Sequence, residues 1–245
     1  MTSRLTGRRR LYLMRHGHVD YFAPRITDFN AVPLTEEGRR QATQTGTALG
    51  RIRFDAVFTS GLPRTLQTAQ LVLAQSAEDQ PAPVEISDFA ELRGGNFVVP
   101  TREELAARLA FSFDNATDPG ATFLPGGEAF ADAYERVQDG LSQLIGYHEW
   151  STALLVGHDG VNRLILGLAC GAGLAGIGAF EQDLACVNVL DFDVVHGDDG
   201  TLSFARIMIK AVNLTAYDPV KEALIKTSLE HLFDIDFGGA RPLPQ

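Results

Sequence analysis

Arg15, His16 and Gly17 are the residues near the N-terminus whose types are best suited to chemistry. They follow the apolar run 11–14, which favours a β-strand and would place the imidazole of His16 at the end of a sheet. A neutral imidazole is a competent nucleophile near pH 7, and an adjacent arginine can neutralise two phosphate oxygens through parallel hydrogen bonds. The pattern is typical of chemistry on a phosphate ester, although the tripeptide alone is a weak signal.

Three further motifs place polar side chains where predicted strands end. Arg64 lies in the opening turn of a predicted helix, directly after a strand predicted over residues 54–59. Glu91 lies just before a glycine-containing loop, and His158 follows the most apolar predicted strand, residues 152–156. In an open α/β sheet, strand ends converge on one crevice, so we expect these residues to meet the first motif there.

The reaction of a phosphate monoester assigns a role to each of these side chains. The ester is an anion, so Arg15, Arg64 and a protonated His158 would concentrate positive charge for it in an otherwise acidic chain. His16 would attack phosphorus if a backbone carbonyl held its other nitrogen and so fixed the tautomer. Gly17 lets such a carbonyl come near.

The departing alkoxide is a poor leaving group and needs a proton donor. Glu91 suits that role because apolar neighbours, such as Phe89 and Leu92, would keep its carboxyl group protonated. Glu85 and Asp88 are rival candidates for the acid. Water would then attack the phosphohistidine, with Glu91 now acting as the base.

With two further segments, these motifs resemble the histidine phosphatase superfamily, also called the phosphoglycerate mutase-like family, in their order and approximate spacing. Pro33–Ala42 resembles the start of the family's first helix. Leu124–Glu128, followed by Asp132 and Arg136, resembles the segment that opens its third long helix. The resemblance covers roughly residues 10 to 195, and several ordered motifs are more specific than one.

The resemblance implies both a fold and a mechanism. The implied fold is α/β, a three-layer α/β/α sandwich with a mostly parallel central sheet. The implied mechanism passes through a phosphohistidine, with His16 as the nucleophile and Glu91 as the proton donor. Arg15, Arg64 and His158 would form the phosphate pocket with His16. Neither a metal ion nor a cofactor is expected.

The chain departs from the family pattern around the first motif. His18 stands where a glutamate commonly follows Arg-His-Gly, and Val19 and Phe22 stand where relatives often have polar residues. We expect His18 and Phe22 at the rim of the pocket, in contact with the substrate. Residues 92–127 should form a cap over the pocket that shapes specificity. This cap holds four phenylalanines and three basic residues, namely Phe97, Phe111, Phe113, Phe123, Arg93, Arg102 and Arg108.

These features favour a metal-independent phosphatase that acts on a small-molecule monoester with an aromatic or aliphatic body. A phosphoglycerate mutase must hold a carboxylate and a second phosphate, and would need more positive charge in the cap. A non-catalytic phospholigand-binding module on the same fold is a second alternative, although both histidines and both arginines are present. A metal-dependent hydrolase built on His16, His18, His158 and Asp159 is a third, disfavoured because Arg15 would repel a divalent cation.

The composition predicts one globular domain spanning residues 1–245, with a loose tail at about 238–245. Its 21 basic and 31 acidic residues give a net charge of −10, which argues against nucleic acid or an anionic membrane as a partner. Arg8–Arg10 precede only four apolar residues, too few for a signal peptide, so a cytoplasmic protein is expected. A homodimer is compatible with these features.

Other conspicuous residues have structural interpretations. Glu128 would lie at the N-terminal end of a helix, where the helix dipole favours a carboxylate. Asp159 would cap the helix that follows His158. Cys170 and Cys186 have neither metal-site nor disulfide spacing, and both are expected to be buried thiols.

Hydrophobic periodicity predicts alternating strands and helices. Thr35 is suited to cap the first long helix, which has acidic residues in its first turn and Gly50 at its end. The glycine- and aspartate-rich residues 196–200 predict a hairpin turn between two late strands. Predicted strands cover residues 11–15, 54–59, 84–86, 152–156, 186–193 and 203–212, and predicted helices cover 35–50, 62–75, 101–110, 127–147 and 160–169.

Overall fold

A computed structural model gives the fold of most of the chain. Several sequence predictions lie outside the described residues. They are the positions of Phe22, Phe97 and Arg102, the tail at 238–245, most of the helix predicted over 101–110 and most of the turn predicted over 196–200. The described residues are 4–21, 23, 28–95, 101, 104, 108–109, 111–147, 149–197 and 201–233.

The centre of the fold is a mixed sheet in the order β3-β2-β4-β1-β5-β6. Strands β3, β2, β4 and β1 run parallel to one another, whereas β5 pairs antiparallel with both β1 and β6. The prediction of a mostly parallel sheet is confirmed. The strands are β1 (Arg4–Arg15), β2 (Ala56–Thr59), β3 (Val84–Glu85), β4 (Thr152–Gly157), β5 (Val187–His196) and β6 (Leu202–Leu214).

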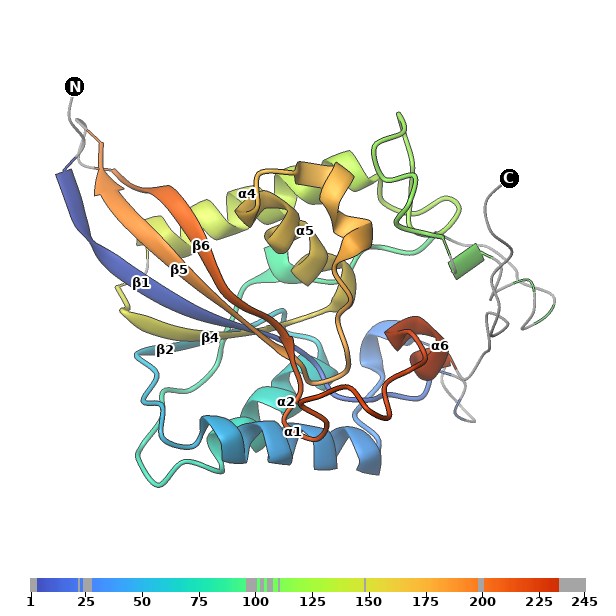
Figure 1. Cartoon of the computed structure of the whole chain (residues 1–245), viewed down its shortest axis with the longest axis horizontal. Helices are drawn as coiled ribbons and strands as arrows, with labels where there is room; N and C mark the ends of the chain where they lie inside the picture. The colour runs from blue at the N-terminus through green and yellow to red at the C-terminus, as the bar shows by residue number, and fades with distance from the viewer. Residues whose placement is uncertain are drawn as a thin grey trace.

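Helices cover both faces of the sheet, as Figure 1 shows. Helices α1 and α2 pack together on one face, where α2 contacts β2 and β4. Helices α4 and α5 lie on the other face and contact β6, and α5 also contacts β1. This arrangement confirms the predicted α/β/α sandwich. The helices are α1 (Glu36–Leu49), α2 (Pro63–Leu73), α4 (Phe130–Tyr147), α5 (Asp159–Ala169) and α6 (Ser228–Phe233), with short 3₁₀ turns at η1 (Phe29–Ala31), η2 (Ser87–Phe89) and η3 (Gly173–Ala179).

Alternation along β1 explains the two layers of core. Leu11 and Leu13 point to the face covered by α4 and α5, and Met14 packs with Leu154 and Val156 toward α1 and α2. Successive side chains of a strand point to opposite faces, so an apolar strand buried on both faces stabilises both layers. In the part of the chain that the structure describes, no helix is long and apolar enough to cross a membrane.

Local signals set the starts of the helices on the α1/α2 face. The hydroxyl of Thr35 accepts a hydrogen bond from the Gly38 amide at 3.1 Å, which confirms the predicted cap of α1. Pro63 is the first residue of α2, where its missing N–H costs no hydrogen bond.

Strand β1 begins seven residues earlier than predicted because β5 extends beside it as an antiparallel partner. Arg8 and Arg10 pair with Asp193 and Asp191 across the two strands, at 2.8 and 2.7 Å. The basic run is therefore part of the sheet. Periodicity missed it because its charged side chains find partners only on a strand far along the sequence.

The two cysteines differ in environment. Cys186 is buried, and its burial raises the pKa of the thiol to about 12. Cys170 is exposed at the C-terminal end of α5, so the prediction of two buried thiols is wrong for it. It follows the last turn of α5, where the chain turns away from the core.

Candidate active site

Strand ends bring the candidate residues together. Arg15 ends β1 and His16 follows it, while His158 follows the neighbouring parallel strand β4. The His16 amide donates to the carbonyl of Gly157 at 3.1 Å, which joins the two strand ends. The rings of His16 and His158 lie with their centroids 5.2 Å apart. The predicted convergence of these two motifs is confirmed.

His16 is oriented as a nucleophile requires. Its Nδ1 lies 2.7 Å from the carbonyl oxygen of Gly17, so Nδ1 carries the proton and donates it, leaving a lone pair on Nε2. Burial, together with the charges of Arg64 and Arg15, holds the pKa of the imidazole well below its usual value. The ring is therefore neutral at pH 7, and the carbonyl expected beside Gly17 is in place.

Gly17 also has a packing role. A Cβ at this position would overlap the backbone carbonyl of Gly38, in the first turn of α1. A Cβ on Gly38 would in turn overlap the backbone of His18. The loop that carries His16 therefore lies directly against the start of α1, with no room for a side chain on either glycine.

His158 is held by a hydroxyl network that sequence analysis did not identify. Its Nε2 lies 2.8 Å from the Ser60 hydroxyl, which lies 3.0 Å from the hydroxyl of Thr65 in α2. Burial and the charge of Arg64 hold the pKa of His158 well below its usual value. The expected protonated ring is therefore wrong, because a buried imidazole beside an arginine is more stable without a second charge.

Arg15 and Arg64 are almost fully buried, and the charges of both act on His16 and His158. Arg15 donates to the carbonyl of Gln182, and Arg64 donates to the carbonyl of Phe29 at 3.1 Å. The Arg64 guanidinium also lies over the ring of Tyr21, 5.9 Å from its centroid. Each arginine thus has a fixed position with donors to spare.

Three buried nitrogen atoms around His16 have no hydrogen-bond partner among the described residues. They are Nε of Arg15, Nε of Arg64 and Nδ1 of His158. Buried polar groups are nearly always satisfied, because an unpaired one costs about 1–3 kcal/mol. A bound anion would satisfy such groups in this pocket.

Glu91 follows η2 and lies against the first turn of α5. Its Oε1 accepts a hydrogen bond from the Leu92 amide at 2.9 Å, and lies 2.8 Å from where a Cβ on Gly160 would be. Burial, and then the negative charge of Asp159, raise the pKa of the carboxyl group. Such a carboxyl group holds its proton to higher pH than an exposed one.

The rival acids lie in different surroundings. Asp88 packs its side chain against Gly140 of α4, and Glu85 is exposed at the sheet edge with its carboxyl group against Gly61. The positive charges of Arg64 and Arg15 act on the Glu91 carboxyl group and partly offset the rise in its pKa. The geometry therefore favours Glu91 over both rivals.

A buried ion pair holds the segment that leads to Glu91. Arg136 of α4 donates Nε and Nη2 to the two carboxylate oxygens of Glu128, both at 2.8 Å. Its Nη1 donates to the carbonyls of Asp88 and Ala90, at 2.6 and 3.1 Å. Burial of Glu128 opposes its ionisation, but the hydrogen bonds and charges of Arg136 and Arg93 together outweigh burial and lower the pKa of Glu128. We name this group the Arg136 clamp.

The Arg136 clamp was not predicted. Glu128 precedes α4 by two residues and is bound by side chains, so its interpretation as a carboxylate that interacts with the helix dipole was incomplete. Asp159 is likewise not a cap: His158 is the N-cap of α5, and the Asp159 carboxylate pairs with Arg163 at 2.7 Å.

His18 lies at the edge of this group of residues. Its Nδ1 lies 2.8 Å from the Thr35 hydroxyl, and its ring packs against His231 of α6, with centroids 5.5 Å apart. Its contact with substrate stays a prediction. Among the residues that the structure describes, no three or more histidines, cysteines or carboxylates are grouped as metal ligands.

The described cap aromatics do not gather around His16. Phe113 is buried in the core and stacks on Phe123 at a centroid distance of 5.0 Å. Phe111 and Phe123 line a separate hollow of about 510 Å³, whose lining includes none of the five candidate catalytic residues. The expected apolar wall of the phosphate pocket is therefore wrong for Phe113, because its ring fills the space beside α4 and α5 instead.

Comparison with known proteins gives consistent relatives. The family model of the histidine phosphatase superfamily (branch 1) matches residues 11–198. The adenosylcobalamin/alpha-ribazole phosphatase of Escherichia coli (strain K12) is 28% identical over 187 residues, which are 75% of this chain and 90% of that protein. A probable phosphoglycerate mutase of Salmonella choleraesuis is 29% identical over 151 residues, 60% of this chain and 68% of that protein.

Solved structures share the fold. A putative alpha-ribazole-5'-P phosphatase from Escherichia coli superimposes with a TM-score of 0.64 at 25% identity, covering 84% of this chain and 96% of that one. A mycobacterial glucosyl-3-phosphoglycerate phosphatase superimposes with a TM-score of 0.66 at 22% identity, covering 84% and 99%. The matched region contains all five candidate catalytic residues, and the chain belongs to branch 1 of the histidine phosphatase superfamily.

Proposed function

We propose that this chain hydrolyses phosphate monoesters through a phosphohistidine on His16, with Glu91 as general acid and then general base. The observation that carries the proposal is a neutral, oriented imidazole beside three buried nitrogen atoms that have no hydrogen-bond partner among the described residues, two of them arginine donors. A phosphoryl group has three equatorial oxygens, and donors aimed at them stabilise the charge of the transition state.

The first step transfers the phosphoryl group to the enzyme. The Nε2 lone pair of His16 attacks phosphorus while the bond to the leaving oxygen breaks. Arg15, Arg64 and His158 hold the phosphoryl oxygens, and the carboxyl group of Glu91 gives its proton to the leaving oxygen. The raised pKa of Glu91 supports this role, because the group must be protonated when the ester binds.

The second step returns the enzyme to its starting state. Water attacks phosphorus, the N–P bond breaks, and the electron pair returns to Nε2 of His16. The Glu91 carboxylate takes one proton from the water as the new P–O bond forms. Inorganic phosphate then leaves a site in which Glu91 is again protonated and His16 is again neutral.

A mutase-type phosphotransferase is the second candidate, supported by the similarity to a probable phosphoglycerate mutase. The described arginines of the cap argue against mutase activity. Arg93 pairs with Glu128 at 3.0 Å and Arg108 pairs with Glu104 at 2.9 Å, so neither is free to bind a second phosphate or a carboxylate. We therefore favour hydrolysis over transfer.

The test is phosphate release from a panel of monoesters in the presence of a chelator. The panel includes alkyl and nitrophenyl phosphates, an alpha-ribazole phosphate and a phosphorylated glycerate, because relatives are named for substrates of the last two classes. We expect release that survives the chelator and disappears in His16→Ala. Isomerisation of phosphoglycerate as fast as the best hydrolysis would favour the mutase instead.

A further inference from the structure

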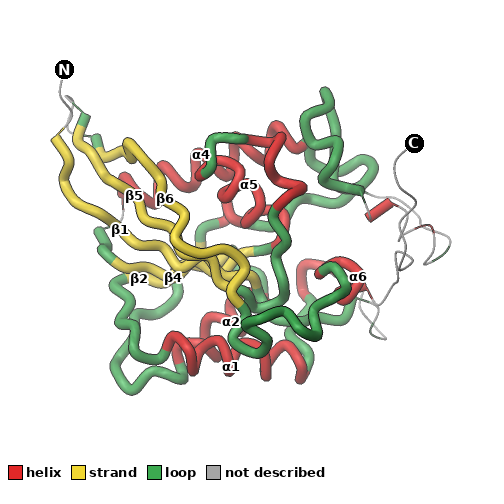
Figure 2. The backbone as a smooth tube through the Cα atoms, in the orientation of Figure 1, coloured by secondary structure: helices red, strands yellow, loops and turns green. Residues whose placement is uncertain are grey.

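The segment after β6 lies beyond the residues that the family model matches, yet it returns to the phosphate site. Residues 215–227 form loops and turns that lead to α6, as the tube in Figure 2 shows. Leu229 and Leu232 of α6 are buried in two different core clusters. The segment is therefore docked on the domain, and Ser228 at the start of α6 is buried as well.

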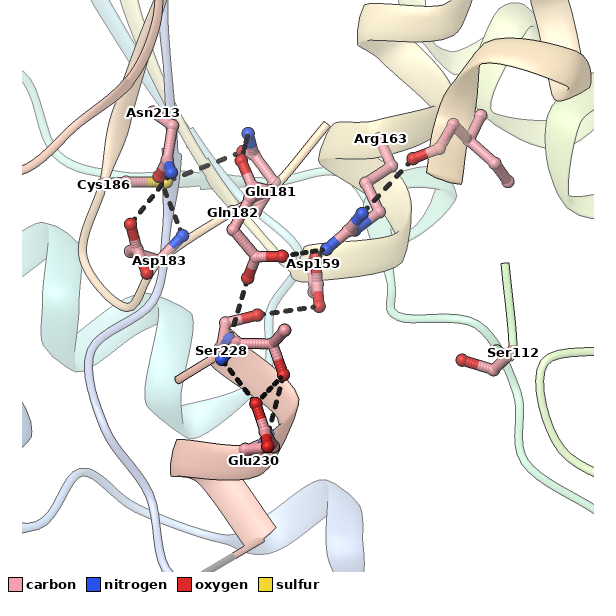
Figure 3. Close-up of polar contacts among 12 residues, drawn as sticks. Ser112, Asp159, Arg163, Glu181, Gln182, Asp183, Cys186, Asn213, Ser228 and Glu230 are labelled. Atoms are coloured by element: carbon pink, nitrogen blue, oxygen red, sulfur yellow. Dashed lines mark hydrogen bonds and ion pairs between the residues drawn. The ribbon is translucent and has the colours of Figure 1, made fainter. Parts of the chain in front are cut away.

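Polar contacts join Ser228 to Glu181 and Asp159, as drawn in Figure 3. The Ser228 amide donates to Oε1 of Glu181 at 2.8 Å, and the other oxygen of Glu181 accepts from Arg163 at 3.2 Å. Arg163 also donates to Oδ1 of Asp159 at 2.7 Å. The Ser228 hydroxyl lies 3.5 Å from Oδ2 of the same aspartate. These four residues are named here the Asp159 network.

The Asp159 network ends at Arg15. Oδ2 of Asp159 lies 3.8 Å from Nη1 of Arg15, and both side chains are almost fully buried. The same Nη1 donates to the carbonyl of Gln182, the residue directly after Glu181. Of these two contacts of the Arg15 guanidinium, one is therefore with Asp159, a member of the network. The other is with Gln182, which follows the network residue Glu181 in the chain.

Opposite charges stabilise the Asp159 network. Asp159 lies between the guanidinium groups of Arg15 and Arg163, with Glu181 on the far side of Arg163. Two arginines and two carboxylates compensate one another, and all of these side chains except the partly exposed Glu181 are almost fully buried. Removing one charge from such a group leaves the others buried and uncompensated, which is more disruptive than removing an exposed charge.

We propose that the Asp159 network is a positioning device for Arg15, and that the C-terminal segment takes part in phosphate binding through Ser228. This inference rests on the proposed role of Arg15 as a phosphate ligand. Asp159, Arg163, Glu181 and Ser228 do not touch the substrate. They fix the guanidinium at the distance and angle at which it meets a phosphoryl oxygen.

The same segment offers a matched control. The Tyr217 hydroxyl donates to the carbonyl of Leu184 at 2.7 Å, outside the network. Tyr217→Phe and Ser228→Ala each remove one hydroxyl from the C-terminal segment. Only the second hydroxyl lies next to Asp159.

The experiment measures inorganic phosphate binding by calorimetry and competitive inhibition, beside thermal unfolding of each variant. We expect Asp159→Asn and Glu181→Gln to weaken phosphate affinity about tenfold, since a hydrogen bond to a charged group is of that order. Ser228→Ala should weaken phosphate affinity by a smaller factor of about three, which corresponds to the low end of the free energy of a neutral hydrogen bond. Ser228→Thr should retain the phosphate affinity of the unmodified protein. Tyr217→Phe should bind phosphate like the unmodified protein.

Three results would overturn the inference. The first is unchanged phosphate affinity in both Asp159→Asn and Glu181→Gln, and the second is an equal loss in Tyr217→Phe. The third is an unchanged Ser228→Ala, which would remove the C-terminal segment from the network. Glu181 is partly exposed, so its variant gives a result even if Asp159→Asn does not fold. If the unmodified protein neither binds phosphate nor hydrolyses esters, the proposed function itself fails, which is a distinguishable outcome.

Discussion

Removing the guanidinium of Arg136 should separate catalysis from phosphate binding. In Arg136→Met, the buried carboxylate of Glu128 loses two hydrogen bonds, and the carbonyls of Asp88 and Ala90 lose one each. Breaking a buried ion pair by removing one partner costs about 3–5 kcal/mol. Arg93 still compensates Glu128 from the exposed side, so we expect the lower end, about 3 kcal/mol. For a chain of this size that corresponds to a fall in Tm of about 6–12 °C.

The kinetic effect should be larger on kcat than on phosphate affinity. The lost bonds fix the backbone that leads to Glu91, and a misplacement of about 1 Å costs on the order of a hundredfold in rate. The hydrogen bonds given above for Arg15, Arg64 and His158 do not involve Arg136, and the Arg136 charge is a lesser influence on His158 than burial and Arg64. Inhibition by phosphate should therefore change less than about threefold, a small free-energy difference. Steady-state kinetics with phosphate as the inhibitor measures both quantities on one preparation.

Arg40 provides the matched control. It makes the same two-bond contact with Glu37, at 2.8 and 2.6 Å, but on the exposed face of α1. Arg40→Met should cost less than about 1 kcal/mol, because exposed ion pairs contribute little. The reasoning fails if Arg136→Met is no less stable than Arg40→Met, or if phosphate affinity falls as far as kcat does.

Three further outcomes follow from the site. His16→Ala should lose more than about a thousandfold in activity while still unfolding as a folded protein does, and turnover above that level would exclude His16 as the nucleophile. Glu91→Gln should slow phosphoenzyme formation from an alkyl phosphate by about 10²–10⁴-fold. It should slow phosphoenzyme formation from a nitrophenyl phosphate much less. If single-turnover measurements gave equal losses for the two substrates, Glu91 would be excluded as the acid. The Glu91 proton is present below its raised pKa and lost above it, so phosphoenzyme formation should decline as pH rises through that value. The decline should be absent in Glu91→Gln, and a pH profile identical in the two proteins would contradict the assignment.

The sequence was sufficient for most of the long helices and central strands and for the convergence of the motifs. Apolar runs before Arg15 and His158 predicted the central parallel strands, and parallel strand ends meet at one edge of a sheet. Thr35 predicted a helix start because its hydroxyl caps the helix through a bond only three residues away. Each of these signals is local or depends on a general rule of sheet topology.

The supporting contacts were not predictable in the same way. The His158–Ser60 contact joins residues 98 positions apart, and the contact between His18 and His231 joins the two ends of the domain. Hydrophobic periodicity carries no information on contacts between residues so far apart in the sequence. The Asp159–Arg163 pair was within reach, since residues four apart share one helix face. The neutral state of His158 depends on burial and on Arg64, which only the folded structure brings together.

The mutual contact of Gly17 and Gly38 has a consequence for how this site tolerates variation. Each glycine lies against the backbone of the other's loop, so a side chain at either position meets atoms that cannot move aside by changing rotamer. Substituting both residues together offers no relief, because the overlap is with backbone in each case. Natural selection should therefore treat Gly38, which makes no contact with substrate in the proposed mechanism, as strictly as Gly17. A mutational scan read out by growth or folding should find substitutions of Gly38 as damaging as substitutions in the motif Arg15–Gly17. The cause at Gly38 would be steric overlap and not the loss of a catalytic group.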